Sequence, residues 1–179
     1  SSADNSGSIT THGEYAYGML ASDHSQVSNI GSITTNGACA YGMLASDHSY
    51  AVNSGSVTTH GVSAIGMRAE NYSTAEGGTI ETLGGSSYGM YAYNHSTALN
   101  TSNESIETWG QDADGMVAGS YSTATNTGSV TTHGDYAEGM NIYGTSTGDN
   151  SGSLATYGDR SHGMYLYDRS EGINSGTIV

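Results

Sequence analysis

One aliphatic position recurs along the whole chain, inside a segment that reads Gly-Ser-aliphatic-Thr-Thr in its most regular copies. Successive copies are 24 residues apart in five of the seven intervals, and the other two intervals are 23 and 26 residues. A fixed period of this length is typical of repeat architectures in which each copy forms one structural unit. The position is filled by Ile9, Ile33, Val57, Ile80, Ile106, Val130 and Leu154, and Ile178 begins a further copy.

Each of the seven methionines occupies one slot of the same repeat, directly after a glycine. A serine always follows six residues beyond the methionine, and a threonine always follows two residues beyond the aliphatic position. Such constant columns indicate one structural environment that is repeated in every copy. Methionine, which is flexible enough to fill an irregular core, is therefore expected inside. The methionines are Met19, Met43, Met67, Met90, Met116, Met140 and Met164.

Side chains of a strand alternate between its two faces, and the repeat follows this period of two. Ile9 and Thr11 belong to nearly constant columns and are expected to face the interior, whereas Ser8 and Thr10 belong to variable columns and are expected outside. The columns of Tyr17 and Leu20, beside the methionine, also vary and are predicted to face solvent. The pattern predicts two short strands in each copy, with glycine at a corner between them.

These features predict an all-β fold, a right-handed, single-stranded parallel β-helix of about seven coils. Residues 1–179 form one β-solenoid domain with coils starting near residues 5, 29, 53, 76, 102, 126 and 150, and an eighth coil is truncated at 174–179. An asparagine precedes the Ser-aliphatic strand in most copies, so we expect Asx turns and an asparagine ladder along the axis. The extra residues of the longest copy, around Asn103, are expected to form a turn.

The composition narrows the classes of partner. Asp and Glu total 17 against three basic residues, giving a formal net charge of −14. This charge repels phosphate backbones, so nucleic acid is excluded as an expected partner. No apolar run is long enough to cross a bilayer, so this segment is not expected to insert into a membrane. The single cysteine, Cys39, excludes a disulfide within the chain.

The repeat N-S-G-S-I-T-T-H-G-x-x-A-x-G-M-x-A, which runs from Asn5 to Ala21 with close copies at 53–69 and 126–142, resembles repeats in the passenger regions of large bacterial autotransporters. The resemblance covers the whole chain. It implies a right-handed β-helix displayed outside a bacterial cell, serving adhesion or aggregation or acting as a stalk. The motif is specific for the solenoid and weak for any activity, and similar repeats occur in other large surface proteins.

No catalytic residues are assigned, and no cofactor is expected. Right-handed β-helices that cleave polysaccharides carry a carboxylate pair or a basic cluster in a groove. The nearest candidates are Asp112 and Asp114, two residues apart and expected on the outer face as solvated side chains. The sequence places no histidine or arginine near them. The prediction is therefore a protein that is not an enzyme.

A weaker candidate is a metal site on an exposed turn. His24 and His48 occupy the same column of adjacent coils, preceded by Asp23 and Asp47. Stacking brings these four potential ligands within about 5 Å along the axis, where a divalent cation can be held. The next copy replaces both ligands, so no metal is assigned.

Two surfaces are candidates for binding. The first is a flat hydroxyl face that can match ordered water, which makes ice binding an alternative function; Glu81, Glu107 and Trp109 interrupt it. The second is tyrosine-rich and suits recognition of a protein or a glycan, because tyrosine offers a large contact area at low entropic cost. The hydroxyl face consists of Ser8, Thr10, Ser32, Thr34, Ser56, Thr58, Ser129 and Thr131; the tyrosine-rich surface contains Tyr91, Tyr93, Tyr143, Tyr165 and Tyr167.

The first hypothesis is therefore a non-enzymatic, extracellular segment of a bacterial surface protein, whose partner is a host protein or a glycan receptor. A further alternative is a filament subunit that associates with itself, end to end or laterally. Neither Ser1–Asn5 nor the residues 176–179 can cap a solenoid, and open strand edges are templates for pairing.

Overall fold

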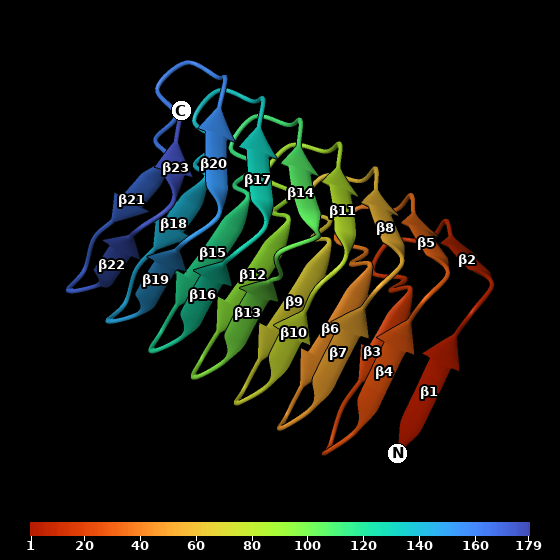
Figure 1. Cartoon of the computed structure of the whole chain (residues 1–179). Coiled ribbons are helices and arrows are strands. Elements are labelled where there is room, and N and C mark those ends of the chain that lie inside the picture. The colour runs from red at the N-terminus through yellow and green to blue at the C-terminus, as the bar shows by residue number, and fades with distance from the viewer.

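The computed structural model describes all 179 residues and contains 23 short β-strands. The chain winds as a right-handed β-solenoid of about seven coils, stacked from the N-terminal end to the C-terminal end (Figure 1). Every strand pairs in parallel with the equivalent strands of the coils before and after it, so the coils form three sheets. No helix suited to crossing a bilayer is found.

Sheet A contains the first strand of each coil and was not predicted from the sequence, which indicated two strands for each copy. Its inward positions hold small side chains such as Val27, Ala51 and Ala75, so its hydrophobic signal is weak. Its strands, in spatial order, are β1 (Ser2–Asn5), β4 (Gln26–Asn29), β7 (Tyr50–Asn53), β10 (Thr74–Glu76), β13 (Thr97–Asn100), β16 (Thr123–Asn126), β19 (Thr147–Asn150) and β22 (Glu171–Asn174).

Sheet B contains the predicted Ser-aliphatic-Thr-Thr strands. The aliphatic residues are in register from coil to coil, for example Ile9 with Ile33 and Ile33 with Val57. Its strands are β2 (Ser8–Thr11), β5 (Ser32–Thr35), β8 (Ser56–Thr59), β11 (Thr79–Thr82), β14 (Ser105–Thr108), β17 (Ser129–Thr132), β20 (Ser153–Thr156) and β23 (Thr177–Ile178).

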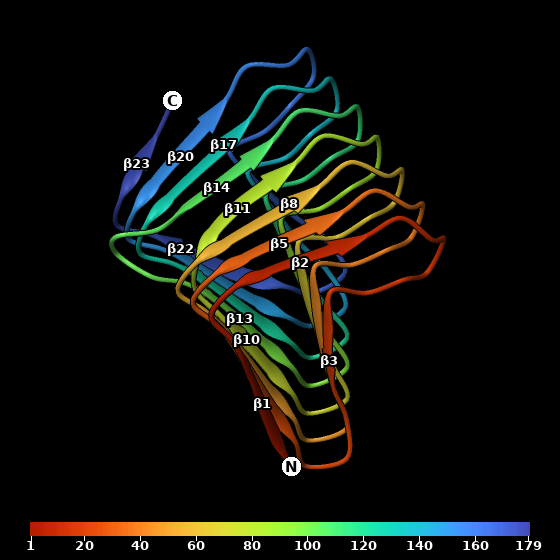
Figure 2. The same cartoon turned by 90° about the vertical axis from the view of Figure 1, so that its right-hand side faces the viewer.

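Sheet C contains the strands that begin at each methionine. Sheets A and C converge at the tight turn that joins them, and sheet B spreads away from both (Figure 2). The strands of sheet C are β3 (Met19–Ala21), β6 (Met43–Ser46), β9 (Met67–Glu70), β12 (Met90–Tyr93), β15 (Met116–Gly119), β18 (Met140–Ile142) and β21 (Met164–Leu166).

The core is a narrow column of aliphatic, methionine and alanine side chains enclosed by the three sheets. The predicted interior methionine column is confirmed, since Met43, Met67, Met90, Met116 and Met140 are fully buried. Thr11 and its counterparts also face inward, and each hydroxyl that is buried donates to the carbonyl oxygen five residues on, as Thr35 does to Ala40 at 2.6 Å. A buried hydroxyl without such a partner is costly, which explains the constant threonine.

Two coils vary the core by combining a large side chain with a facing glycine. Ile142 stands where the other coils have alanine, and the facing residue of sheet A is Gly148. A Cβ atom on Gly148 would lie 2.6 Å from Cγ1 of Ile142, which is closer than real contacts allow. Gly172 makes the same accommodation for Leu166 in the next coil. The large and small residues are therefore a compensating pair.

The predicted asparagine ladder and Asx turns are confirmed. Asn29 Nδ2 donates to Asn53 Oδ1 at 2.7 Å, and Asn29 Oδ1 accepts the backbone N–H of Gly31 at 3.2 Å. The ladder stops at the coil that is one residue short, where Gly77 and Gly78 follow Glu76 with positive φ. A Cβ atom on Gly78 would lie 1.7 Å from Nδ2 of Asn53, and this Nδ2 has no hydrogen-bond partner.

The additional residues of the longest copy form a turn, as expected. Glu104 closes it, because its carboxylate accepts hydrogen bonds from the backbone N–H and the hydroxyl of Thr101. The constant serine forms a second ladder, in which the hydroxyl oxygen of Ser73 accepts the backbone N–H of Ser49. The asparagine column thus provides hydrogen bonds to backbone groups at the turn between sheets A and B, and the serine column does so at the turn between sheets C and A.

Candidate functional site

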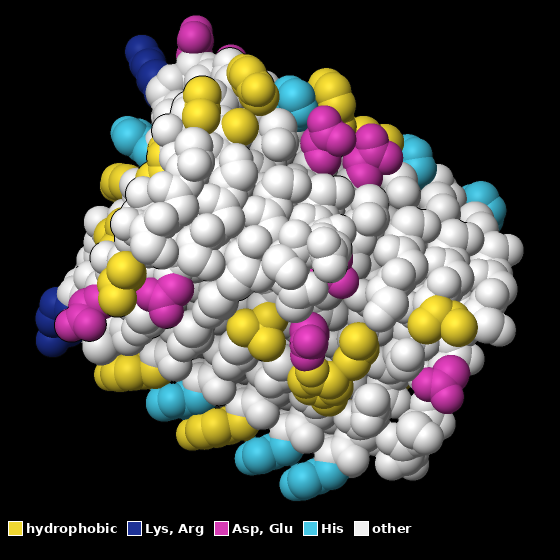
Figure 3. All heavy atoms as spheres, viewed as in Figure 1, with side chains coloured by type: hydrophobic (Ala, Val, Ile, Leu, Met, Phe, Trp, Pro, Cys, Tyr) yellow, Lys and Arg dark blue, Asp and Glu magenta, His cyan; other side chains and the backbone are white.

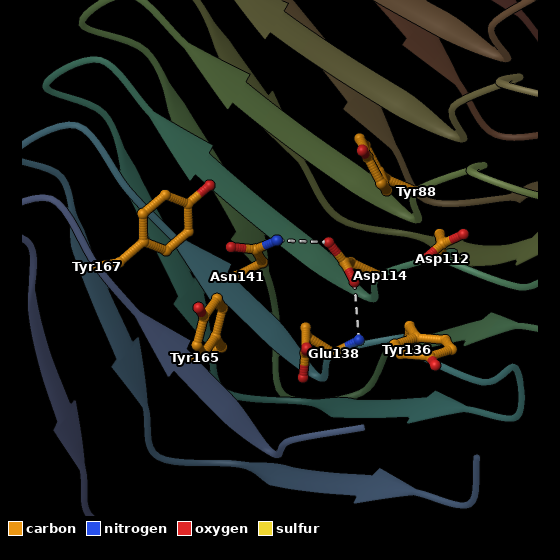
Figure 4. Close-up of a pocket in the computed structure, with 8 residues that line it drawn as sticks. All are labelled: Tyr88, Asp112, Asp114, Tyr136, Glu138, Asn141, Tyr165 and Tyr167. Atoms are coloured by element: carbon orange, nitrogen blue, oxygen red, sulfur yellow. Dashed lines mark hydrogen bonds between the residues drawn. The ribbon is translucent and has the colours of Figure 1, made fainter. Parts of the chain in front are cut away.

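A hollow of about 350 Å³ lies on the outer side of sheet C, across the coils that contain β12, β15, β18 and β21 (Figure 4). Three carboxylate side chains, one asparagine and four tyrosines form its walls. The lining residues are Tyr88, Asp112, Asp114, Tyr136, Glu138, Asn141, Tyr165 and Tyr167.

Asp114 was expected to be a solvated surface residue, and the structure corrects this, since only 4% of it is exposed. Its Oδ1 atom accepts the backbone N–H of Glu138 at 2.7 Å, and its Oδ2 atom accepts Nδ2 of Asn141 at 2.8 Å. Burial raises the pKa of this carboxyl to about 7, against the two hydrogen bonds, which lower it. Asp112, by contrast, is exposed as predicted.

Glu138 repeats the arrangement one coil on. Only 8% of it is exposed, and its carboxylate accepts the backbone N–H of His162 and lies 3.0 Å from the His162 ring Nδ1. Each carboxylate therefore caps the N–H group of the same column in the following coil. The two carboxylates therefore provide hydrogen-bond acceptors for backbone N–H groups, and they also form part of the wall of the hollow.

Sequence analysis missed Glu138 and Asn141 as neighbours of Asp114, and His162 as a neighbour of Glu138. The signal was present in the column two residues before each methionine, which changes from tyrosine or isoleucine to Asp114, Glu138 and His162 in three consecutive coils. Parallel stacking brings residues of one column together even though 24 residues separate them in sequence. The outward column of Leu20 is also partly covered, because Leu44 and Val117 are buried.

The tyrosine-rich surface is a connected cluster at the edge of the hollow. The hydroxyl groups of Tyr91 and Tyr143 lie 2.6 Å apart, although these residues are two coils apart. Tyr143 reaches back across Gly119, where a Cβ atom would lie 2.3 Å from its ring. Tyr143 stacks on Tyr167, and Tyr167 lies 5.3 Å from Tyr165 between ring centroids. Tyr93 packs against Tyr91. These packed rings are restrained in orientation before any partner binds.

The weak metal candidates lie on the turn between sheets C and A. Asp23 and His24, like Asp47 and His48, adopt two consecutive positive φ values. The two imidazole rings stack with centroids 5.0 Å apart and planes 3° apart. Two nitrogens on one zinc ion lie at most about 4.2 Å apart, given Zn–N bonds of about 2.1 Å. Parallel rings at this spacing do not converge on one ion, and no group of three or more potential ligands is found anywhere in the chain.

The same turn carries an exposed ladder of five stacked rings, which runs along the lower edge of the molecule in Figure 3. Neighbouring centroids are between 4.8 and 5.2 Å apart. Sequence analysis found only its first two members, because the column mixes histidine with tyrosine. The rings are His24, His48, Tyr72, His95 and Tyr121.

The hydroxyl face lies on the outside of sheet B. Thr10, Thr34 and Thr58 are in register across three coils, and Glu81 and Glu107 replace them in the next two. The register returns at Thr131. Ser8, Ser32, Ser56 and Ser129 form the parallel row of the same sheet. Beside the carboxylates, Trp109 stacks on His133 at 3.9 Å, and His133 contacts Glu107 at 2.9 Å. The face is thus a regular lattice over three coils only.

Comparison with known proteins identifies one family. The sequence model of the family described as the BigA third pectate lyase-like domain matches residues 1–103 and, in a second overlapping match, residues 72–179. Together the two matches span the whole chain. No curated protein and no solved structure matches it.

Proposed function

Because the chain belongs to the family of the BigA third pectate lyase-like domain, we propose that it is a β-helix segment of a bacterial surface protein that binds a partner outside the cell. In this proposal it is an adhesive, non-enzymatic part of a passenger region, similar to those of autotransporters. Its partner is a host protein or a glycan, held on the outer face of sheet C.

The observation that carries the proposal is the tyrosine cluster beside the hollow. Tyr165 and Tyr167 are 43% and 45% exposed, yet their rings are fixed by packing against each other and against Tyr143. Exposed aromatic rings that are already ordered contribute contact area with little loss of side-chain entropy, which is the property of binding hot spots. A stalk without a binding role does not require such a cluster.

A non-enzymatic role agrees with the state of the carboxylates. Both oxygens of Asp114 accept hydrogen bonds from the protein, and Glu138 caps a backbone N–H group. A general acid or a nucleophile must instead present its oxygen to the substrate. Hydrolysis or elimination of a polysaccharide that disappears in Asp114→Asn or in Asp112→Asn would contradict this part of the proposal.

The adhesive role is tested by coating beads with the protein and measuring their binding to host cells and to arrayed glycans and proteins. The double variant Tyr165→Ser/Tyr167→Ser is expected to lose most of the binding. The matched control is Tyr157→Ser, whose ring is 69% exposed on another side of the solenoid. Equal binding by the double variant and the wild type would reject the tyrosine cluster as the binding surface.

Ice binding is a second candidate, favoured by the in-register hydroxyl lattice of β2, β5 and β8. In this case Thr10, Thr34 and Thr58 match ordered water, and the acidic pair Glu81 and Glu107 limits the area of the lattice. Thermal hysteresis or shaped ice crystals, lost in Thr34→Lys, would support it. Unmodified ice growth in the presence of the protein would reject it.

A further inference from the structure

Three coils before Asn141, the outer face of sheet C holds a basic side chain in a cage. Arg68, in β9, donates from Nη1 to the Tyr41 hydroxyl at 2.9 Å and pairs through Nη2 with Glu70 at 2.7 Å. Its guanidinium carbon lies 5.4 Å from the centroid of the Tyr41 ring and 5.3 Å from that of Tyr91. The cage thus combines two aromatic faces with a carboxylate, which are the groups that attract an organic cation.

The repeat places a related group of side chains at the hollow. Asn141 occupies the column of Arg68, and it contacts Asp114 across one coil as Arg68 contacts Tyr41. Tyr165 corresponds to Tyr91, because it follows in the next coil of the same column. Asparagine is much shorter than arginine, so the space that a guanidinium fills beside β9 remains open beside β18. The hollow thus has a carboxylate, Asp114, in place of Tyr41 and a tyrosine, Tyr165, in place of Tyr91, and it lacks the arginine between them.

The charge of the lining also favours a cation. Asp112, Asp114 and Glu138 line the hollow, and no basic residue does. Arg160, which is not a lining residue, lies with its guanidinium carbon 5.5 Å from the Tyr136 centroid and donates to the Tyr136 hydroxyl. Tyr136 is thus a lining tyrosine that already contacts a cation within the chain. A covered acceptor, Oδ1 of Asn141, has no hydrogen-bond donor.

We propose that the hollow binds a basic side chain, in the first instance an arginine, of a partner polypeptide, in the position that Arg68 occupies three coils earlier. This inference rests on the adhesive function proposed above and specifies its ligand. A volume of about 350 Å³ is at the lower end of the range of small-ligand pockets and suits one inserted side chain rather than a polymer. The guanidinium lies among the carboxylates of Asp112, Asp114 and Glu138, and its flat face lies against Tyr165. Anionic polysaccharides are repelled by the same carboxylates.

The test uses nuclear magnetic resonance titration of the whole chain with the capped tripeptide acetyl-Gly-Arg-Gly-amide, followed at the tyrosine ring resonances. Acetyl-Gly-Gln-Gly-amide is the uncharged control, and glucosamine tests an amino sugar as the source of the cation. We expect millimolar binding of the arginine peptide and at least tenfold weaker binding of the other two. Equal binding of the arginine and glutamine peptides, no binding of either, or stronger binding of glucosamine would each overturn the proposal.

Two variants and one control variant test whether the arginine peptide binds in the hollow. Asp112→Asn/Glu138→Gln keeps the side-chain oxygen that caps His162 and should weaken binding of the arginine peptide at least tenfold, whereas Glu14→Gln, an exposed acid in the first coil, should leave it unchanged. Asn141→Arg should fill the hollow from within and abolish binding while the fold is retained. Undiminished binding by this variant would overturn the proposal. If bead adhesion still depends on Tyr165 and Tyr167 but the arginine peptide does not bind, only the ligand class fails.

Discussion

Asn100 Nδ2 donates a hydrogen bond of 2.7 Å to Oδ1 of Asn126, one coil away, inside a column that solvent does not reach. Asn126 in turn donates to Asn150 at 2.8 Å. The amide of Asn126 is thus both acceptor and donor along the axis, and these bonds fix the register of neighbouring coils. In a solenoid, stability depends on such contacts between adjacent repeats.

Replacing one member of this ladder should therefore destabilise the chain strongly. Asn126→Ala removes one of the two acceptors of Asn100 Nδ2, whose other acceptor is the carbonyl oxygen of Ser129, and leaves the Oδ1 of Asn150 without its donor. We expect the free energy of unfolding to fall by about 3 kcal/mol, given about 1–3 kcal/mol for each buried group left unpaired. Urea denaturation followed by circular dichroism measures it. Asn103→Ala, in the exposed turn of the longest coil, is the control and should change stability by less than about 0.5 kcal/mol.

The glycine before each methionine is expected to tolerate no side chain. A Cβ atom on Gly115 would lie 2.1 Å from Cγ1 of Val130 and 2.7 Å from the carbonyl oxygen of Gly139. The backbone atom cannot move without breaking the ladder of sheet C. Gly115→Ala should cost about 3 kcal/mol or more, the size of a severe overpacking effect. Gly85→Ala is the matched control, because its Cβ would meet only one atom, at 3.6 Å. Similar unfolding midpoints for the two variants would contradict the packing at this corner.

The fold could be predicted from the sequence because stacking repeats each environment in every coil. The column of Met43 and Met67 is constant because it faces the interior in every coil. The column of Asn29 and Asn53 is nearly constant because the turn at that position requires a side-chain amide. Sheet A was missed because its interior side has little room and selects alanine or glycine, as at Ala124 and Gly148, and small residues carry little hydrophobic signal.

The candidate site was predicted less well, because it depends on departures from the repeat. Asp114 was identified, but its burial follows from Glu138 and Asn141, which belong to the next coil. The tyrosine surface was identified as a set of residues, but not the contact of Tyr91 with Tyr143 across two coils, which requires Gly119 between them. Constant columns report the shared environment, whereas a site is formed by the positions where columns differ.

The buried carboxyl of Asp114 predicts an unusual dependence of stability on pH. Its pKa is raised from 3.8 to about 7 in the folded chain, so between these values the folded state holds a proton that the unfolded state has released. The free energy of unfolding therefore falls as pH rises from 4 to 7, and the full cost of the buried charge is present above pH 7. Asp114→Asn removes this cost.

The stability of Asp114→Asn relative to the wild type should thus increase between pH 4 and pH 8 by an amount on the order of 2–4 kcal/mol. Its new amide can still accept the N–H of Glu138, and Asn141 can turn its free Oδ1 toward the new Nδ2. Urea midpoints at several pH values measure the difference. Asp112→Asn, at an exposed position, should show no such trend, and parallel curves for Asp114→Asn and the wild type would contradict the shifted pKa.

The compensating pair in the core predicts a coupled effect. Gly148→Ala alone places a methyl group 2.6 Å from Cγ1 of Ile142 and should cost about 1–3 kcal/mol, the usual range for overpacking. Ile142→Ala restores the alanine found in the other coils and gives room to that methyl group. The double variant should therefore be more stable than the sum of the single effects predicts, with a coupling of about 1 kcal/mol or more. Additive effects would show that the two side chains do not share one space.

Mild peroxide oxidation of the folded chain tests the coil arrangement as a whole. Thioethers of Met43, Met67, Met90, Met116 and Met140 are fully buried, whereas Met19 is 8% exposed and Met164 is half-buried. Oxidation of the buried group requires an opening of the structure, and each 1.4 kcal/mol of opening free energy slows it about tenfold. Met164 should react first and Met19 second, with the other five at least about a hundredfold slower than free methionine. Peptide mass mapping over time gives the order. Seven methionines that react at the rate of the free amino acid would place the column outside the coils, a position that the aliphatic register of sheet B and the asparagine ladder do not allow.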